Sequence, residues 1–230
     1  MAENFNISMK GYVTIKDSLT HEVLVDTHND VLKYNASTAL ANALIGAPGS
    51  TIYYMAFGTG AASVDNSGLI TYKPSIALNL NRKDYTANLY DTIYVKKILN
   101  DTSSSVYLKT SNVTEKFDEI VINVKLDYDQ PSVIYSISTT NSIDNSTSAG
   151  SNSVTTINDL IFNEIGLFCG STNIFDAADA QTQSDVSLFT DTGMYGNKTK
   201  LMLTHAIFHP IQKSSNRSLD ITYTLKVEAQ

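Results

Sequence analysis

The sequence predicts a mainly β protein, an antiparallel two-sheet β-sandwich with one short helix and long polar loops. Several segments alternate apolar and polar residues with a period of two, which is typical of strands that have one buried face. The 230-residue chain is rich in Ser, Thr and Asn, has 13 tyrosines and carries only 17% charged residues. This composition favours strands and turns over helices. Strand-like segments do not alternate with helical ones, which argues against a parallel α/β sheet.

The clearest strands lie near the N-terminus, in the middle and at the C-terminus. Their inward-facing sets are Met9, Gly11, Val13 and Ile15; Ile120, Ile122, Val124, Leu126 and Tyr128; and Leu219, Ile221, Tyr223, Leu225 and Val227. Shorter strand-like runs cover residues 52–57, 92–99, 106–109, 133–138, 160–168 and 200–208. From these patterns we expect five residues in the core: Leu203, Ile207, Ile221, Tyr223 and Leu225.

One short helix is predicted at about residues 37–45. Asn35 or Ser37 can cap its N-terminus. Gly46 can end it in a left-handed conformation, with Pro48 just beyond. The apolar residues expected to share its buried face are Ala39, Leu40, Ala43 and Leu44. A helix this short needs to pack on the sheet to be stable.

The chain is expected to form a single β-rich domain, residues 1–230, with loop insertions near 139–158 and 170–199. The first insertion consists almost entirely of small polar residues. Loops of this length within a compact domain are usually functional or disordered. No internal repeat marks a second domain.

Charge and cysteine content exclude several classes of partner. The 16 basic residues are scattered and outnumbered by 23 acidic ones, so we expect no nucleic-acid partner. Cys169 is the one cysteine, which rules out an intrachain disulfide, and its apolar surroundings in the sequence predict a small buried hydrophobe. A polar N-terminus without a signal-peptide pattern, and the lack of an 18-residue apolar run, predict no membrane insertion.

Two histidines have a spacing that resembles a metal site. His205 and His209 are four residues apart, which would place both rings on one face of a helix. The surrounding residues favour a strand, on which they would be separated by about 13 Å. We therefore expect two strand histidines that are hydrogen-bonded or partly exposed, and no metal site.

Glu164 lies inside an apolar run, where an isolated carboxylate would be costly to bury. We interpret it as a structural residue anchored by Lys, Arg or backbone N–H groups. A catalytic role would require a second carboxylate at a set distance, and the sequence does not distinguish among the candidates Asp118, Asp127, Asp129 and Asp159.

Two further motifs have structural interpretations. Gly58-Thr59-Gly60 follows an apolar run without the lysine and helix of a phosphate loop, so it predicts a tight turn. Tyr53 and Tyr54 are interpreted as aromatic residues that pack in cross-strand pairs, with stacking on sugars as the alternative. No catalytic, cofactor-binding or metal-binding residue is assigned, and we expect neither an enzyme nor a cofactor.

Several blocks of the chain together resemble virion structural proteins of contractile-tailed phages, including cyanophage-type phages. In chain order they are the segments 11–17 (GYVTIKD), 35–41 (NASTALA), 54–60 (YMAFGTG), 162–167 (FNEIGL) and 201–213 (LMLTHAIFHPIQK), followed by the last strand from Asn216-Arg217 onward. The block at 201–213 is the most specific of them.

The resemblance implies a structural subunit of a tailed-phage virion, located at the neck or collar, the tail or baseplate, or the head surface. It implies homo-oligomeric assembly, contacts with neighbouring virion structural proteins, and localisation in the virion after assembly in the bacterial host cytoplasm. It brings no catalytic residues.

Two alternatives stay open at the level of sequence. Long polar loops and many tyrosines suit a receptor-binding or adhesin module of a tail appendage that recognises bacterial surface glycans. A tail-attached glycan hydrolase has only Glu164 and the unplaced aspartates in its favour.

Overall fold

The computed structural model describes residues 7–47, 50–79, 86–98, 104–110, 117–130, 133–137, 153–157, 160–170, 179–180, 194–195 and 198–229. Within these residues the protein is mainly β, with two helices, α1 (Lys33–Leu44) and α2 (Ile76–Asn79). This confirms the prediction of a mainly β, antiparallel protein. One short helix was predicted and overlaps α1, whereas α2 was not predicted. Neither helix of the described residues has the length and apolar character needed to cross a membrane.

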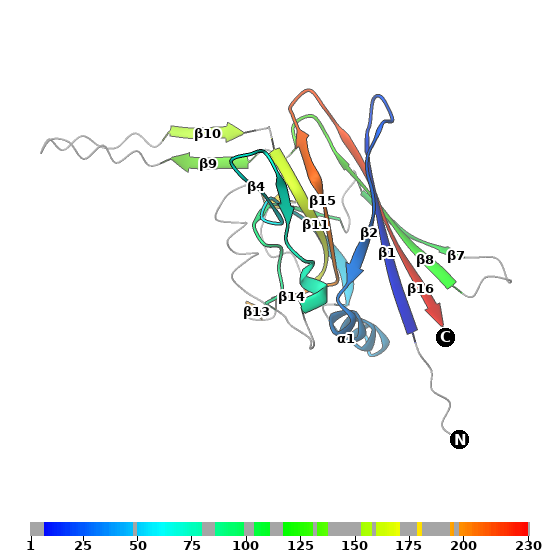
Figure 1. Ribbon diagram of the computed structural model, residues 1–230. Coiled ribbons are helices and arrows are strands. Elements are labelled where there is room, and N and C mark those ends of the chain that lie inside the picture. Colours follow the sequence, from blue (N-terminus) through cyan, green and yellow to red (C-terminus); the bar gives the residue numbers. More distant parts are fainter. Residues whose placement is uncertain are drawn as a thin grey trace, which may run out of the picture.

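Twelve strands belong to one antiparallel sheet, and four others form two hairpins (Figure 1). The sheet contains β1 (Ile7–Asp17), β2 (Val23–Val31), β3 (Thr51–Gly58), β6 (Thr92–Lys97), β7 (Ser104–Thr110), β8 (Phe117–Leu126), β11 (Leu160–Gly170), β12 (Asp179–Ala180), β13 (Met194–Tyr195), β14 (Lys198–Met202), β15 (Thr204–Lys213) and β16 (Leu219–Ala229). The hairpins are β4 (Ala62–Val64) with β5 (Ile70–Tyr72), and β9 (Val133–Ile137) with β10 (Ser153–Ile157).

The main sheet runs in the order β12-β6-β3-β11-β15-β2-β1-β16-β8-β7, with β14 alongside β11 and β13 beside β14. We divide this order into two halves, β12-β6-β3-β11-β15 and β2-β1-β16-β8-β7. They are linked where the start of β15 pairs with the end of β2, through Thr204 opposite Val31 and His205 opposite Asp30. The sheet is therefore curled and continuous, and the structure does not confirm the predicted two separate sheets of a sandwich.

An irregularity in β15 accompanies the link between the halves. Phe162 and Glu164 of β11 are two residues apart, whereas their partners Ile211 and Ile207 on β15 are four apart. Extra residues on one strand of a pair form a bulge, which bends the strand and increases its twist. Such a bend is consistent with β15 pairing with β11 along most of its length and with β2 at its start.

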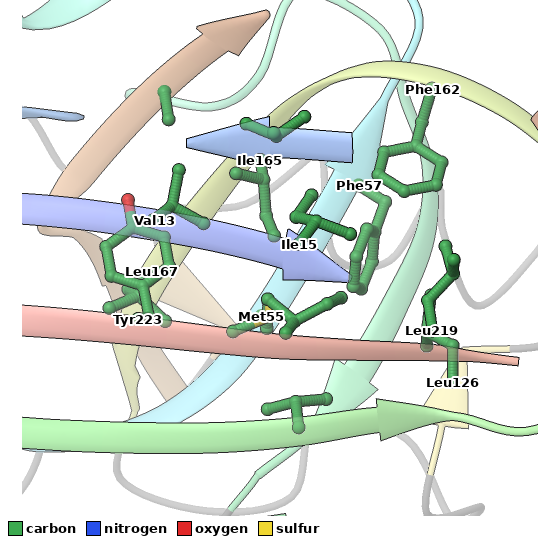
Figure 2. Close-up of a cluster of buried hydrophobic side chains, with 14 of the residues drawn as sticks. Val13, Ile15, Met55, Phe57, Leu126, Phe162, Ile165, Leu167, Leu219 and Tyr223 are labelled. Carbon is green, nitrogen blue, oxygen red and sulfur yellow. The ribbon is translucent and has the colours of Figure 1, made fainter. Parts of the chain in front are cut away.

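The two halves enclose one hydrophobic core (Figure 2). Side chains from β1, β8 and β16 meet side chains from β3 and β11; those labelled in the figure are Val13, Ile15, Leu126, Leu219 and Tyr223 from the first half and Met55, Phe57, Phe162, Ile165 and Leu167 from the second. The period-two patterns of β1, β8 and β16 thus have the predicted phase, because their apolar sets line this core. Two residues of these sets are exceptions: Tyr128 lies beyond the end of β8 and is exposed, and Val227 is half-buried and outside the core cluster.

Four of the five predicted core residues are confirmed: Leu203, Ile221, Tyr223 and Leu225 are buried. Ile207 is only half-buried, so that prediction is wrong. Its neighbours Ala206 and Phe208 belong to the core, and the side chain between them points to the other face of β15.

Helix α1 begins earlier than predicted and buries a different face. Its N-cap residue is Leu32, without a side-chain cap, and Asn35 lies inside the helix, where its Nδ2 donates to the Met202 carbonyl oxygen (2.9 Å). Because this contact orients the helix, Ala39 is buried. The other three residues of the predicted face, Leu40, Ala43 and Leu44, are exposed. The stop at Gly46, whose φ is +65°, is confirmed.

The two predicted loop insertions fall mostly outside the described residues. Within 139–158, residues 153–157 form β10. Within 170–199, short strand segments occur at β12, β13 and the start of β14. Strand therefore replaces loop at these described positions.

Candidate functional site: a buried Glu–His pair and the depression beside it

Glu164 lies in the middle of β11, and its side chain is fully buried. β11 is a central strand, with β3 on one side and β15 on the other. A central strand covered on both faces reads as a nearly continuous apolar run, and the burial pattern from Phe162 to Gly170 is buried throughout. A carboxylate in this position needs partners for every oxygen.

Four donors surround the Glu164 carboxylate. Oε1 accepts from the backbone N–H groups of Gly60 and Asp91, both at 3.0 Å. Oε2 accepts from the Tyr90 N–H at 3.1 Å and from Nε2 of His205 at 2.9 Å. Each carboxylate oxygen thus accepts two hydrogen bonds, which matches its two lone pairs.

Both ring nitrogens of His205 are also engaged. Nδ1 accepts a hydrogen bond from the Ile76 N–H at 3.0 Å, so the ring proton lies on Nε2, which donates it to Glu164. The ring is fully buried. This arrangement fixes a neutral imidazole in one tautomer and attaches the start of α2 to β15.

The environment of Glu164 favours its charged form. Burial raises the pKa of this carboxyl, but the hydrogen bonds from His205 and from the N–H groups of Asp91 and Tyr90 outweigh burial and lower the pKa below its usual value. A carboxylate that accepts several hydrogen bonds is stabilised in the ionised state.

The neighbouring turn is shaped by the same strand. Asn163 accepts from the Ala61 N–H (3.1 Å) and donates to the Thr59 carbonyl oxygen (2.9 Å). A Cβ on Gly60 would lie 2.6 Å from the Tyr90 Cβ, which is too close for any residue with a side chain at this position. The tight turn predicted for Gly58-Thr59-Gly60 is therefore confirmed, and Asn163 and Glu164 hold it.

These contacts give Glu164 a structural task, because it holds together the turn after β3, the segment before β6 and, through His205, the start of α2. The interpretation of a glutamate anchored by backbone N–H groups is confirmed. Three of the candidate second carboxylates do not contact it, because Asp118 lies in β8 and Asp127 and Asp129 follow that strand. The fourth candidate, Asp159, is outside the described residues.

His209 has different surroundings from His205. It is exposed, and its Nδ1 lies 3.2 Å from the Tyr72 hydroxyl. The prediction of strand histidines that are hydrogen-bonded or partly exposed is confirmed. Among the described residues there is no group of three His, Cys, Asp or Glu side chains placed to hold a metal ion.

Cys169 is buried, as predicted, and its Sγ lies 3.3 Å from the Ser50 carbonyl oxygen. Burial raises the pKa of the thiol to about 12, which leaves almost no reactive thiolate at neutral pH. Tyr54 is fully buried, with its ring centroid 4.7 Å from that of Tyr53. The contact between these tyrosines lies within β3 and not across strands, and because Tyr54 is buried it cannot stack on a sugar.

A shallow depression of about 290 Å³ lies on the surface beside His205. Its lining comes from β2, from the segment after β5 and from β15, and includes His28, Asp30, Tyr72, Lys73, His205 and Ile207. Sequence reasoning missed this site because β2 was not predicted as a strand. No local pattern indicates that residues near positions 28, 72 and 205 come together.

Comparisons of the chain with models of protein families, with curated proteins and with solved structures find no match. The resemblance to phage virion proteins therefore stays a prediction, and the function is argued below from the chain's own residues.

Proposed function

We propose that this protein is a non-enzymatic structural subunit of a tailed-phage virion that acts through assembly with further copies of itself and with neighbouring virion proteins. The blocks of sequence described above support the phage assignment. One observation supports assembly most directly: among the described residues, the strand at one end of the curled sheet has an edge without a partner strand and carries exposed apolar side chains.

β7 is the terminal strand of the sheet, and in the described part of the chain it pairs only with β8. Its central residues Val106, Tyr107 and Leu108 are all exposed, Leu108 to 60%. Val106 and Leu108 lie opposite Ile122 and Ile120 of β8, on the face of the sheet that forms the core further along. A long, apolar edge strand is a template for pairing with another chain, and proteins that stay monomeric usually protect such edges.

The occupant that suits this edge is a second copy of the same strand. An antiparallel pair centred on Tyr107 places Val106 opposite Leu108 of the other copy, and Ser105 opposite its Lys109. No like charges face each other, because Lys109 meets a serine, and Lys109 already forms a 3.0 Å ion pair with Glu119. Such self-complementary contacts are typical of two-fold interfaces, and apolar cross-strand pairs stabilise them.

The test is the oligomeric state of the purified protein, measured by sedimentation velocity. We expect wild type to sediment as a dimer or larger species and Leu108→Lys to shift towards monomer, because a charge at the centre of the edge opposes strand pairing. The matched control is Leu69→Lys, since Leu69 is exposed to a similar extent, 64%, away from β7. A strictly monomeric wild type, or identical behaviour of the two variants, would contradict assembly through β7.

The phage assignment has its own test. Tailed-phage particles purified from a host that expresses this gene should contain the chain in a fixed copy ratio to other virion proteins, measured by quantitative mass spectrometry. Consistent absence from particles would remove the virion assignment even if the protein forms oligomers.

We further propose that the two halves of the curled sheet serve as the two layers of a sandwich, with its outer faces available to neighbours. Support comes from the common core between the halves and from additional exposed apolar residues outside β7. On α1 and its C-terminal end these are Leu40, Leu44 and Ile45. Exposed apolar surface of this kind is typical of proteins that assemble.

A further inference from the structure

We propose that the depression beside His205 is a binding site for a neutral, polyhydroxylated sugar ring. This inference goes beyond the assembly role and does not depend on it. It starts from the unusual combination of exposed side chains around the depression: an aromatic ring, a carboxylate, an ammonium group and an imidazole.

The polar groups of the site project from two separate segments. His28 and Asp30 are two residues apart on β2 and therefore lie on the same face of the strand. Lys73, in the segment after β5, also lines the depression and follows Tyr72 in the chain. Asp30 and Lys73 form no salt bridge with any residue of the described ranges, and all three polar side chains are exposed.

The aromatic wall is held in place by neighbouring contacts. The Tyr72 hydroxyl lies 3.2 Å from Nδ1 of His209, and the Lys73 ammonium lies 4.5 Å from the centroid of the Tyr90 ring. The Tyr90 hydroxyl donates to the Pro74 carbonyl oxygen at 2.7 Å. Walls held in this way lose little conformational entropy when a ligand binds.

The floor is fixed by the buried pair. His205 belongs to the lining, and both of its nitrogens are occupied by Glu164 and by the Ile76 N–H. Because its ring is fully buried, His205 supports the floor from beneath and presents no proton-transfer group to a ligand. Ile207 is half-buried beside it and adds apolar surface.

A neutral sugar suits these groups best. A carboxylate can accept hydrogen bonds from neighbouring sugar hydroxyls. An ammonium group and an imidazole can form hydrogen bonds with the remaining sugar oxygens. An aromatic side chain presents a flat apolar surface to the sugar ring. The charges of Asp30 and Lys73 oppose each other, so neither an anion nor a cation is favoured. The volume of about 290 Å³ is at the lower end of ligand pockets, which limits the site to about one sugar unit.

The experiment is saturation-transfer NMR and titration with methyl glycosides of glucose, galactose, mannose and N-acetylglucosamine, each at about 10 mM. We expect at least one of them to bind with a Kd of about 1 mM. Asp30→Asn should weaken this binding by about tenfold, because it replaces charge-assisted hydrogen bonds with weaker ones.

The matched control is Asp26→Asn. Asp26 is exposed on the same face of β2, four residues and about 13 Å from Asp30, and outside the lining of the depression. Its substitution should leave sugar binding unchanged, and circular dichroism should show both variants folded. The proposal is overturned if no glycoside binds wild type, if Asp30→Asn binds as well as wild type, or if inorganic phosphate binds this site more tightly than every neutral glycoside.

Discussion

Glu164 is a buried carboxylate that joins several separate segments through hydrogen bonds. Its buried carboxylate is the acceptor for three backbone N–H groups and one imidazole. Removing an acceptor from buried donors leaves those donors unsatisfied, and this costs more than the net contribution of the hydrogen bonds themselves. Stability, more than catalysis, should therefore respond to changes at this position.

The first prediction concerns substitution of Glu164. Glu164→Gln should lower the free energy of unfolding by about 1–3 kcal/mol, because an amide N–H₂ group then faces backbone donors. Glu164→Ala should cost about 3–5 kcal/mol, since His205 and three N–H groups lose their partner. The measurement is urea denaturation followed by circular dichroism. Glu119→Gln, which alters only a surface ion pair with Lys109, should change stability by less than about 1 kcal/mol.

The second prediction is that the contribution of Glu164 to the free energy of unfolding depends on pH. The folded-state pKa of Glu164 lies below the ordinary value of 4.5, so the folded state favours the ionised group. This stabilisation is complete above the unfolded-state pKa and is lost as the pH falls through the lower folded-state pKa. The stability difference between wild type and Glu164→Gln should therefore be constant from about pH 7 to 5 and shrink towards about pH 3. A difference that grows on acidification would contradict the assignment.

At the scale of elements, burial on one face explains which strands the sequence predicts well. β1, β8 and β16 lie side by side, with one face on the core, and their period-two patterns give both the strand and its phase. The sequence does not predict β2, because Asp26, His28 and Asp30 occupy its exposed positions and the segment VLVDTHNDV shows little apolar alternation. The sequence predicts helix α1 but not the face that it buries. Asn35, a buried polar residue, sets this face through its hydrogen bond to the Met202 carbonyl oxygen.

The site was less predictable than the sheet. The sequence singles out Glu164 because charged residues are rare in apolar runs, and it singles out His205 only through its spacing from His209. Their partners are backbone N–H groups of Gly60, Tyr90 and Asp91, which carry no side-chain signature. The depression depends on the pairing of β15 with β2, a contact between segments more than 170 residues apart, and no local pattern in the sequence specifies that pairing.

The third prediction compares a core position with a position that faces away from the core, in the last two strands of the chain. Ile221→Ala in β16 should lower stability by about 2–5 kcal/mol, because Ile221 is 1% exposed and its truncation leaves a cavity in the core. Ile207→Ala in β15 should cost about 1 kcal/mol or less, since the half-buried side chain faces away from the core. Urea denaturation of both variants gives the comparison. Equal losses would show that Ile207 belongs to the core after all.

At the scale of the whole molecule, one core ties the two halves of the sheet together. In the described part of the chain, strand pairing between the halves comprises Thr204 with Val31 and His205 with Asp30, and a 2.8 Å hydrogen bond from the Leu32 N–H to the Leu203 carbonyl oxygen continues it. Side-chain packing, by contrast, joins β1, β8 and β16 to β3 and β11 over a single cluster (Figure 2). Neither half could bury its apolar face alone, so the halves should gain and lose their structure together.

The last prediction is a single cooperative unfolding transition. Far-UV circular dichroism and tyrosine fluorescence should report the same midpoint in thermal unfolding, because most strands of both halves line the same core. Ile221→Val in one half and Phe57→Leu in the other should each lower that common midpoint without splitting the transition. Two separate transitions, with each variant shifting only one of them, would show that the halves are independent units and that the shared core contributes little to holding them together.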